Sequence, residues 1–145
     1  MPTATSAAVG DPKVIYIDTS AAMKLVRPEA QSAELSRWFS QRKATSVLIE
    51  VELMRATRRT APERLARASD VLRGIGMVTL SPSVITRAAG YDDRDLRSLD
   101  AIHLATAEHV VSVAHEVLEA IVAYDERLLA AARAIGLPVA APGLA

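Results

Sequence analysis

The chain has 145 residues, half of them hydrophobic and 23% charged, which fits one folded domain and excludes a wholly disordered protein. Its formal net charge is zero, and its aromatic residues are one Trp, three Tyr and one Phe, so neither a basic field nor base-stacking platforms indicate a simple nucleic-acid binder. Cysteine is absent, which excludes disulfides and Cys-ligated zinc.

Residues 1–13 are small and polar, and we expect them to form a flexible leader without the features of a signal peptide. No apolar run reaches the roughly 20 residues that a membrane helix needs, so a cytoplasmic protein that does not contact the membrane is expected. Residues 14–145 are predicted to form one domain.

Short apolar runs alternate with helical patterns along this domain. Strands are predicted at 14–17, 44–48, 77–80 and 120–124, with a short edge strand at 137–139. Helices are predicted at 19–26, 29–41, 49–59, 62–74, 83–89, 98–113 and 126–135, with Ser98 as an N-cap. This alternation predicts an α/β fold, a three-layer α/β/α sandwich with a parallel sheet of four to five strands.

Two aspartates each follow an apolar run and precede a helical pattern. Asp18 comes after the run at 14–17, and Asp125 after the run at 120–124. In an open parallel sheet such positions lie at the carboxyl ends of strands, where ligands bind. The alternative is that each aspartate only caps the helix that follows it, which aspartate does well.

Asp100 and Glu52 are the other candidate acids. Asp100 lies in the first turn of the helix predicted at 98–113, among apolar residues that must face the core, although the helix dipole alone would also explain it. Glu52 and Glu50 are about 200° apart on their helix, so only one of them can join a cluster. For either glutamate the alternative is a solvated surface acid.

Carboxylates that converge without a lysine or arginine repel one another and raise one another's pKa. A hard divalent cation removes that repulsion, and oxygen ligands suit Mg²⁺ or Mn²⁺. Such an ion, alone or in a pair, activates water and stabilises the charge that develops on a phosphodiester. The acids therefore predict a metal pocket at one end of the sheet.

The remaining charged residues are less specific. Arg55, Arg58 and Arg59 could contact phosphate beside the acids, although a solvated helix face is the commoner meaning of such a cluster. His103 and His109 are about 240° apart on their helix and do not form a two-histidine metal site. Glycine-rich nucleotide loops and the Gly-x-Ser-x-Gly hydrolase elbow are absent from the sequence.

Four segments in order resemble the PIN-domain ribonucleases and, within them, the VapC-type toxins of bacterial toxin–antitoxin pairs. They are 15–20, 52–56, 99–107 and 124–128, the last continued by 131–132 and 136–139. Each segment alone is only a weak indication of the family, but four segments in the family's order and spacing are a specific one. Together they cover nearly all of the predicted domain, so the resemblance implies a PIN-like ribonuclease domain over residues 14–145.

The resemblance implies an acidic quartet that is both catalytic and metal-binding, made of Asp18, Glu52, Asp100 and Asp125. It selects Glu52 over Glu50. It also matches Thr19 and Ser20 to hydroxyl positions near the first acid, where they could touch a metal-bound water or a phosphate. Members often have Thr or Ser before the last aspartate, where this chain has Tyr124.

The implied activity is that of a Mg²⁺- or Mn²⁺-dependent endoribonuclease toxin, which hydrolyses RNA to leave 5′-phosphate and 3′-hydroxyl ends. The implied partners are RNA, a second copy in a homodimer, and a small antitoxin whose C-terminal segment enters the acid pocket, where its arginine could replace the metal. The main alternative is a catalytically silent PIN-like binding or regulatory module. A phosphoacceptor receiver domain fits less well, because the paired acids after the first strand and the lysine after the last are absent.

Overall fold

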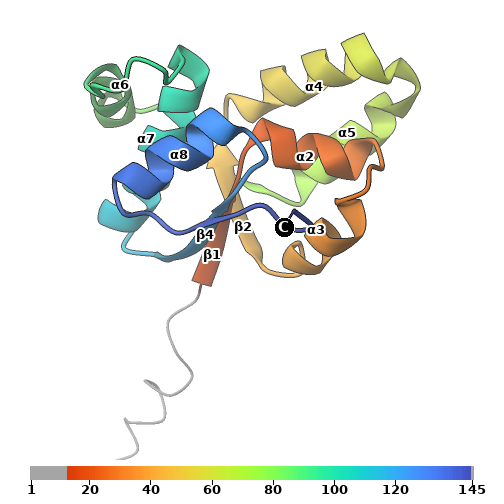
Figure 1. Ribbon diagram of the computed structural model, residues 1–145. Helices are drawn as coiled ribbons and strands as arrows, with labels where there is room; N and C mark the ends of the chain where they lie inside the picture. Colours follow the sequence, from red (N-terminus) through yellow and green to blue (C-terminus); the bar gives the residue numbers. More distant parts are fainter. Residues whose placement is uncertain (1–12, 145) are drawn as a thin grey trace, which may run out of the picture.

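Five parallel strands form the centre of the computed structural model, which describes residues 13–144 (Figure 1). They are β1 (Lys13–Ile17), β2 (Arg42–Ser46), β3 (Gly76–Val78), β4 (Val117–Val122) and β5 (Val139–Ala140). Their order is β3-β2-β1-β4-β5, so the chain leaves β1 for β2 on one side and later returns to β4 on the other. Open parallel sheets bind ligands outside the carboxyl ends of the strands where the order reverses in this way.

Helices cover both faces of this sheet. One layer consists of α2 (Thr19–Val26), α3 (Ser32–Trp38), α4 (Ile49–Thr60) and α5 (Leu65–Arg73), with the short 3-10 helix η1 (Pro62–Arg64) between the last two. The other layer consists of α7 (Ser98–Ser112) and α8 (Glu126–Ala134), with α6 (Pro82–Ala89) packed against α7 (Figure 1). The predicted three-layer α/β/α sandwich is confirmed, with five strands.

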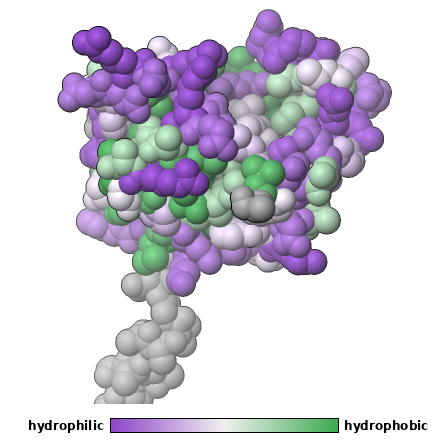
Figure 2. All heavy atoms as spheres, in the orientation of Figure 1, coloured by the Kyte–Doolittle hydropathy of each residue, from purple (hydrophilic) through white to green (hydrophobic). Residues whose placement is uncertain are grey.

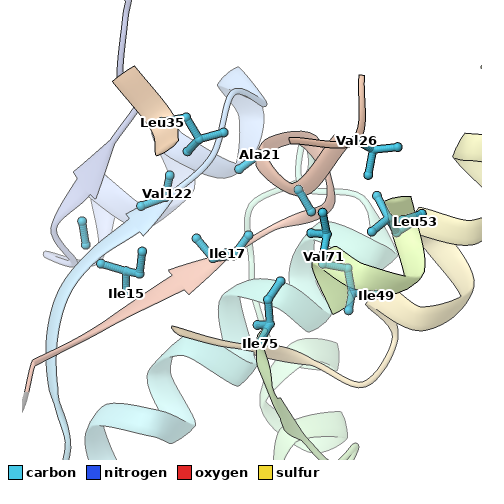
Figure 3. Close-up of a cluster of buried hydrophobic side chains, with 13 residues drawn as sticks. Ile15, Ile17, Ala21, Val26, Leu35, Ile49, Leu53, Val71, Ile75 and Val122 are labelled. Carbon is cyan, nitrogen blue, oxygen red and sulfur yellow. The ribbon is translucent and has the colours of Figure 1, made fainter. Parts of the chain in front are cut away.

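The side chains of β1 alternate between the two layers, as a strand requires. Ile15 and Ile17 pack under α2, α4 and α5 in one core cluster, which Figure 3 shows with Leu53 and Val71. Tyr16 instead points toward α7, in the second cluster. Since β1 is covered on both faces, its sequence is a continuous apolar run, and each large side chain buried there stabilises the fold by roughly 1.5–3 kcal/mol.

Some predicted boundaries at the ends of elements are wrong. Of the leader predicted at 1–13, residues 1–12 lie outside the described residues, and Lys13 is the first residue of β1. The helix predicted at 29–41 begins only at Ser32, whose hydroxyl accepts the N–H of Glu29 and donates to the carbonyl of Lys24, which stabilises a turn before the helix. Ser98 is not an N-cap but the first helical residue, because the carbonyl of Arg97 already accepts a helical hydrogen bond.

The predicted strands are displaced by a few residues. β4 is Val117–Val122 rather than 120–124. Leu118 and Ala120 are both buried, so the strand begins before the predicted start. Glu119 lies between them, is partly exposed and interrupts the apolar run in the sequence. The strands predicted at 44–48, 77–80 and 137–139 lie at Arg42–Ser46, Gly76–Val78 and Val139–Ala140. The helix predicted at 62–74 is divided into η1 and α5.

Hydrophilic residues predominate along the edges of the face shown in Figure 2, whereas apolar residues gather toward its middle, around α8. Within residues 13–144, no helix combines the length and the apolar character needed to cross a membrane. Large apolar side chains exposed elsewhere include Val51 at 58% and Leu99 at 47%, which line one hollow beside Glu52.

Candidate active site

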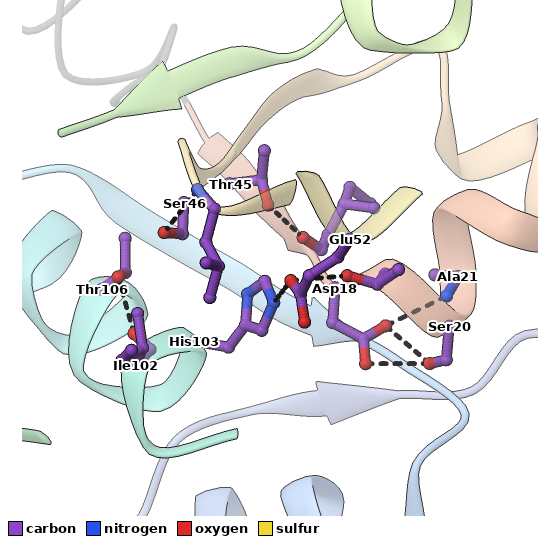
Figure 4. Close-up of polar contacts among 12 residues, drawn as sticks. Asp18, Ser20, Ala21, Thr45, Ser46, Glu52, Ile102, His103 and Thr106 are labelled. Atoms are coloured by element: carbon purple, nitrogen blue, oxygen red, sulfur yellow. Dashed lines mark hydrogen bonds and ion pairs between the residues drawn. The ribbon is translucent and has the colours of Figure 1, made fainter. Parts of the chain in front are cut away.

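Asp18 follows β1 directly and lies at the carboxyl end of the central strand, with 4% of its surface exposed. Its Oδ1 accepts the backbone N–H of Ala21 at 3.0 Å, so Asp18 is also the N-cap of α2. The Ser20 hydroxyl lies 2.6 Å and 2.8 Å from the two carboxylate oxygens (Figure 4). Burial raises the pKa of Asp18 to about 6, a rise that Ser20 and His103 limit and Asp125 increases. One residue therefore both caps a helix and belongs to the candidate site.

Asp125 lies beyond the end of β4, the neighbour of β1, and is partly buried. It caps α8, since its Oδ1 accepts the backbone N–H groups of Arg127 at 2.9 Å and Leu128 at 3.3 Å. Its charge raises the pKa of both Asp18 and Asp100. Asp125 is therefore close enough to both aspartates to repel them.

Asp100 lies in the first turn of α7 and is partly buried. Burial and, next, the charge of Asp125 raise its pKa, while His103 lowers it. The sheet order and the packing of α7 against α8 thus bring together three aspartates from separate elements, Asp18, Asp100 and Asp125. Residues 82 positions apart in the sequence, Asp18 and Asp100, share one end of the sheet.

Glu52 lies in the first turn of α4 and is partly buried, whereas Glu50 is exposed. Its Oε1 accepts the hydroxyl hydrogen of Thr19 at 2.8 Å and lies 2.6 Å from Nε2 of His103. Its Oε2 has no hydrogen-bond partner among the described residues and is not a buried atom. The fold therefore turns Glu52, and not Glu50, toward Thr19 and His103.

His103 is the residue of this region that the sequence did not single out. It is 3% exposed, and its Nδ1 lies 2.7 Å from the hydroxyl of Tyr16 (Figure 4 shows its ring directed at Glu52). The sequence carries one signal for it: His103 is three residues after Asp100, so both lie on the same face of α7. A buried polar ring on that face needs hydrogen-bond partners from other elements.

Both predicted hydroxyl residues contact carboxylates. Ser20 donates to Asp18 and also accepts the backbone N–H of Tyr124 at 2.9 Å, while Thr19 donates to Glu52. The Tyr124 hydroxyl donates to the carbonyl of Pro142 at 2.6 Å. Tyr124 therefore directs its hydroxyl to the C-terminal segment and not to the acids.

A hollow of about 390 Å³ opens beside Glu52, and its lining residues are Thr19, Leu48, Val51, Glu52, Arg55, Ala56, Arg59 and Leu99. Arg55 and Arg59 are exposed and form no ion pair with the described residues. Arg58, the third arginine of the predicted cluster, is exposed on α4 but does not line the hollow. The hollow thus combines apolar walls with two free guanidinium groups.

The donor atoms of the site fit a hard divalent cation. Within residues 13–144, no three His, Cys, Asp or Glu side chains are already grouped as metal ligands. Mg²⁺ nevertheless keeps several waters and needs only one or two protein carboxylates. In the described chain, no lysine or arginine forms an ion pair with Asp18, Asp100 or Asp125, and the charge of Asp125 still raises the pKa of the other two. These carboxylates therefore suit an ion that brings its own waters.

Comparisons with known proteins agree with this architecture. A family model described as the PIN domain matches residues 15–135. Ribonuclease VapC35 of Mycobacterium tuberculosis is 46% identical over 136 residues, which span 91% of this chain and 99% of that protein. Ribonuclease VapC47 of the same species is 40% identical over 137 residues, spanning 90% of this chain and 98% of that protein.

Two solved structures share the fold. The crystal structure of Mycobacterium tuberculosis VapC20, described as a toxin that cleaves the sarcin–ricin loop, has a TM-score of 0.68 at 20% identity and covers 88% of this chain and 99% of that one. A chain of a toxin–antitoxin complex from Klebsiella pneumoniae has a TM-score of 0.66 at 20% identity, covering 88% of this chain and 97% of that one. At this identity the similarity concerns the fold alone.

Proposed function

The chain belongs to the PIN-domain family, and from this membership we propose that it is a metal-dependent endoribonuclease, the toxin of a toxin–antitoxin pair. The observation that carries the proposal is the meeting of Asp18, Asp100 and Asp125 at one end of the sheet, with burial and mutual repulsion raising the pKa of the first two. The relatives named ribonuclease, at 46% and 40% identity, support RNA as the substrate.

The residues that would hold Mg²⁺ or Mn²⁺ are the four acids, Asp18, Glu52, Asp100 and Asp125. When bound there, the ion supplies an activated water and offsets the charge that develops on a phosphodiester. Ser20 and the backbone of Ala21 hold the Asp18 carboxylate in one orientation, and Thr19 does the same for Glu52. The protein thus contributes fixed oxygen ligands, and we expect cleavage to leave 5′-phosphate and 3′-hydroxyl ends.

Arg55 and Arg59 are proposed to bind RNA phosphates, because they line the hollow that contains Glu52 and have no ion-pair partner among the described residues. Arginine side chains contact phosphate by paired N–H donors. Arg58 does not line the hollow and is therefore a weaker candidate for phosphate contact. Two local guanidinium groups beside the acids offset the zero net charge of the chain at the place where RNA would lie.

We further propose that the partner is a small antitoxin whose C-terminal segment enters this region, in a cytoplasmic complex. The apolar walls of the hollow, with Val51 and Leu99 exposed, suit an apolar peptide segment. An arginine from that segment would pair with the acids, since guanidinium and carboxylate bind well. A homodimer is also expected from the family, and light scattering of the purified chain would test it by measuring the molar mass in solution.

A catalytically silent PIN-like module is the second candidate. Two observations favour it: Asp125 uses its Oδ1 to cap α8, and the acids among the described residues are not grouped as ligands. The partial burial of Glu52 and its two hydrogen-bond partners weigh against this alternative, since a solvated Glu52 would mark an unused site.

Two variants on the same helix separate the candidates. Glu52→Gln removes the charge of the inward glutamate, and Glu50→Gln removes that of an exposed one. For the proposed enzyme, RNA cleavage in Mg²⁺ falls at least about tenfold in Glu52→Gln and is unchanged in Glu50→Gln. Wild-type protein that binds RNA without cleaving any of a pool of transfer, ribosomal and messenger RNA identifies the silent module.

A further inference from the structure

We propose that His103 is a positioning residue, which holds Oε1 of Glu52 and leaves Oε2 as the oxygen available to a metal ion or its water. The inference rests on the proposed function of Glu52 as a site acid. Two contacts hold Oε1: the Thr19 hydroxyl at 2.8 Å and Nε2 of His103 at 2.6 Å. Among the described residues, none donates to Oε2.

The hydrogen on Nε2 of His103 follows from its contact with Glu52. The backbone N–H of Ser46 donates to the Tyr16 oxygen at 3.1 Å, and the same oxygen lies 2.7 Å from Nδ1 of His103. Burial raises the pKa of the Tyr16 hydroxyl, which therefore keeps its proton. The Glu52 carboxylate only accepts hydrogen bonds, so Nε2 of His103 carries the N–H that lies 2.6 Å from Oε1.

The network joins elements that the chain itself does not connect. Tyr16 lies on β1, Ser46 at the end of β2, His103 on α7 and Glu52 on α4, so the bonds run from the sheet to one helical layer and across to the other. Tyr16 and His103 are 1% and 3% exposed, and their rings meet edge to face with centroids 5.8 Å apart. A ring packed in this way has one orientation, and Glu52 receives its hydrogen bond from a fixed direction.

Such outer partners of metal-binding side chains have measurable effects. Removing a hydrogen bond that orients a ligand typically lowers metal affinity or activity by about 10–100-fold. A histidine that only filled the core would instead affect stability and leave both quantities unchanged. A positioning role and a core-filling role therefore predict different outcomes for substitutions that keep a nitrogen at the position of Nε2 or at that of Nδ1.

Two amide substitutions each reproduce one of the two ring nitrogens of His103. In His103→Gln, the side-chain amide nitrogen reaches the position of Nε2 and can still donate to Glu52, whereas in His103→Asn it reaches only the position of Nδ1, facing Tyr16. We expect His103→Gln to stay within about threefold of wild type in Mn²⁺ affinity and kcat. We expect His103→Asn to lose about 10–100-fold in both, with KM for RNA changed less than about threefold.

The measurements are calorimetry with Mn²⁺, steady-state RNA cleavage, and crystal structures of the metal-free variants that show the orientation of Glu52. Equal behaviour of the two variants, whether both are active or both inactive, would overturn the proposal. If His103→Asn does not fold, Tyr16→Phe replaces it: removing the hydroxyl that holds Nδ1 should weaken Mn²⁺ binding, and an unchanged affinity and Glu52 orientation would contradict the proposal. Wild-type protein that does not cleave RNA refutes the proposed function, while the orientation of Glu52 in the two variants still decides the role of His103.

Discussion

The Ser20 hydroxyl joins the Asp18 carboxylate to the segment that follows β4: its oxygen lies 2.6 Å from Oδ1 of Asp18 and accepts the backbone N–H of Tyr124 at 2.9 Å. Ser20→Ala should leave that N–H without its partner and remove a bond that lowers the pKa of Asp18. We expect a loss of about 1–3 kcal/mol in the free energy of unfolding, measured by urea denaturation. The control is Ser40→Ala, an exposed serine whose replacement should change stability by less than about 0.5 kcal/mol.

Asp18→Asn should stabilise the metal-free protein while abolishing cleavage. The pKa of Asp18 is raised from 3.8 to about 6, so between these values the folded state binds more protons than the unfolded state, and stability falls as pH rises. The charged carboxylate therefore costs about 3 kcal/mol at most at pH 7, which Asn avoids. Thermal melts from pH 4 to pH 7 should show wild type losing stability relative to Asp18→Asn, and a constant difference would contradict this.

Mg²⁺ or Mn²⁺ should raise the melting temperature of wild type in a concentration-dependent way, since a ligand that binds only the folded state stabilises it. At a concentration 100 times Kd the expected gain is about 2.7 kcal/mol. Asp18→Asn should lose most of this gain, whereas Asp92→Asn, an exposed acid outside the site, should keep it. An equal shift in both variants would mean that the ion binds elsewhere.

Arg55→Ala and Arg59→Ala should each weaken RNA binding. Each should also reduce the slope of log affinity against log salt by about 1, the change expected when one phosphate contact is lost. Both residues line the hollow beside Glu52, whereas Arg58 does not, so Arg58→Ala is the matched control on the same helix. Fluorescence anisotropy at several salt concentrations measures the slope. Equal effects of all three substitutions would indicate a diffuse basic face instead of phosphate contacts in the hollow.

Tyr124→Phe should leave the cleavage rate unchanged, because the hydroxyl donates to the carbonyl of Pro142 and not to an acid. The loss of that hydrogen bond should lower stability by about 0.5–1.5 kcal/mol, measured by denaturation. A tenfold loss of kcat in a folded variant would show that the hydroxyl acts in the site after all.

The fold class and two of the acids could be predicted from the sequence because they depend on local patterns. Asp18 and Asp125 are recognisable by the apolar runs before them and the helices after them, and both are indeed helix N-caps at the carboxyl end of the sheet. The start of β4 could not be predicted in this way, since Glu119 interrupts its apolar pattern. Burial in a strand is decided by the neighbouring elements, which the local sequence does not contain.

The choice between Glu52 and Glu50, and the presence of His103, depend on tertiary packing. Helical geometry places the two glutamates on different faces but does not say which face meets α7; the family resemblance selected Glu52, and the structure has it partly buried against His103. The spacing of His103 and His109 excludes a two-histidine metal site but carries no information about the partners of His103 in other elements. Its actual partners, Tyr16 and Glu52, are 87 and 51 residues away in the sequence.

RNA cleavage in Mg²⁺ and in EDTA, by wild type, Asp18→Ala and Asp100→Asn, tests the central claim most directly. An acidic metal pocket predicts cleavage by wild type in Mg²⁺ only, with products that carry 5′-phosphates, and a loss of at least about 100-fold in both variants although they remain folded. Cleavage that persists in EDTA and in both variants would contradict the account.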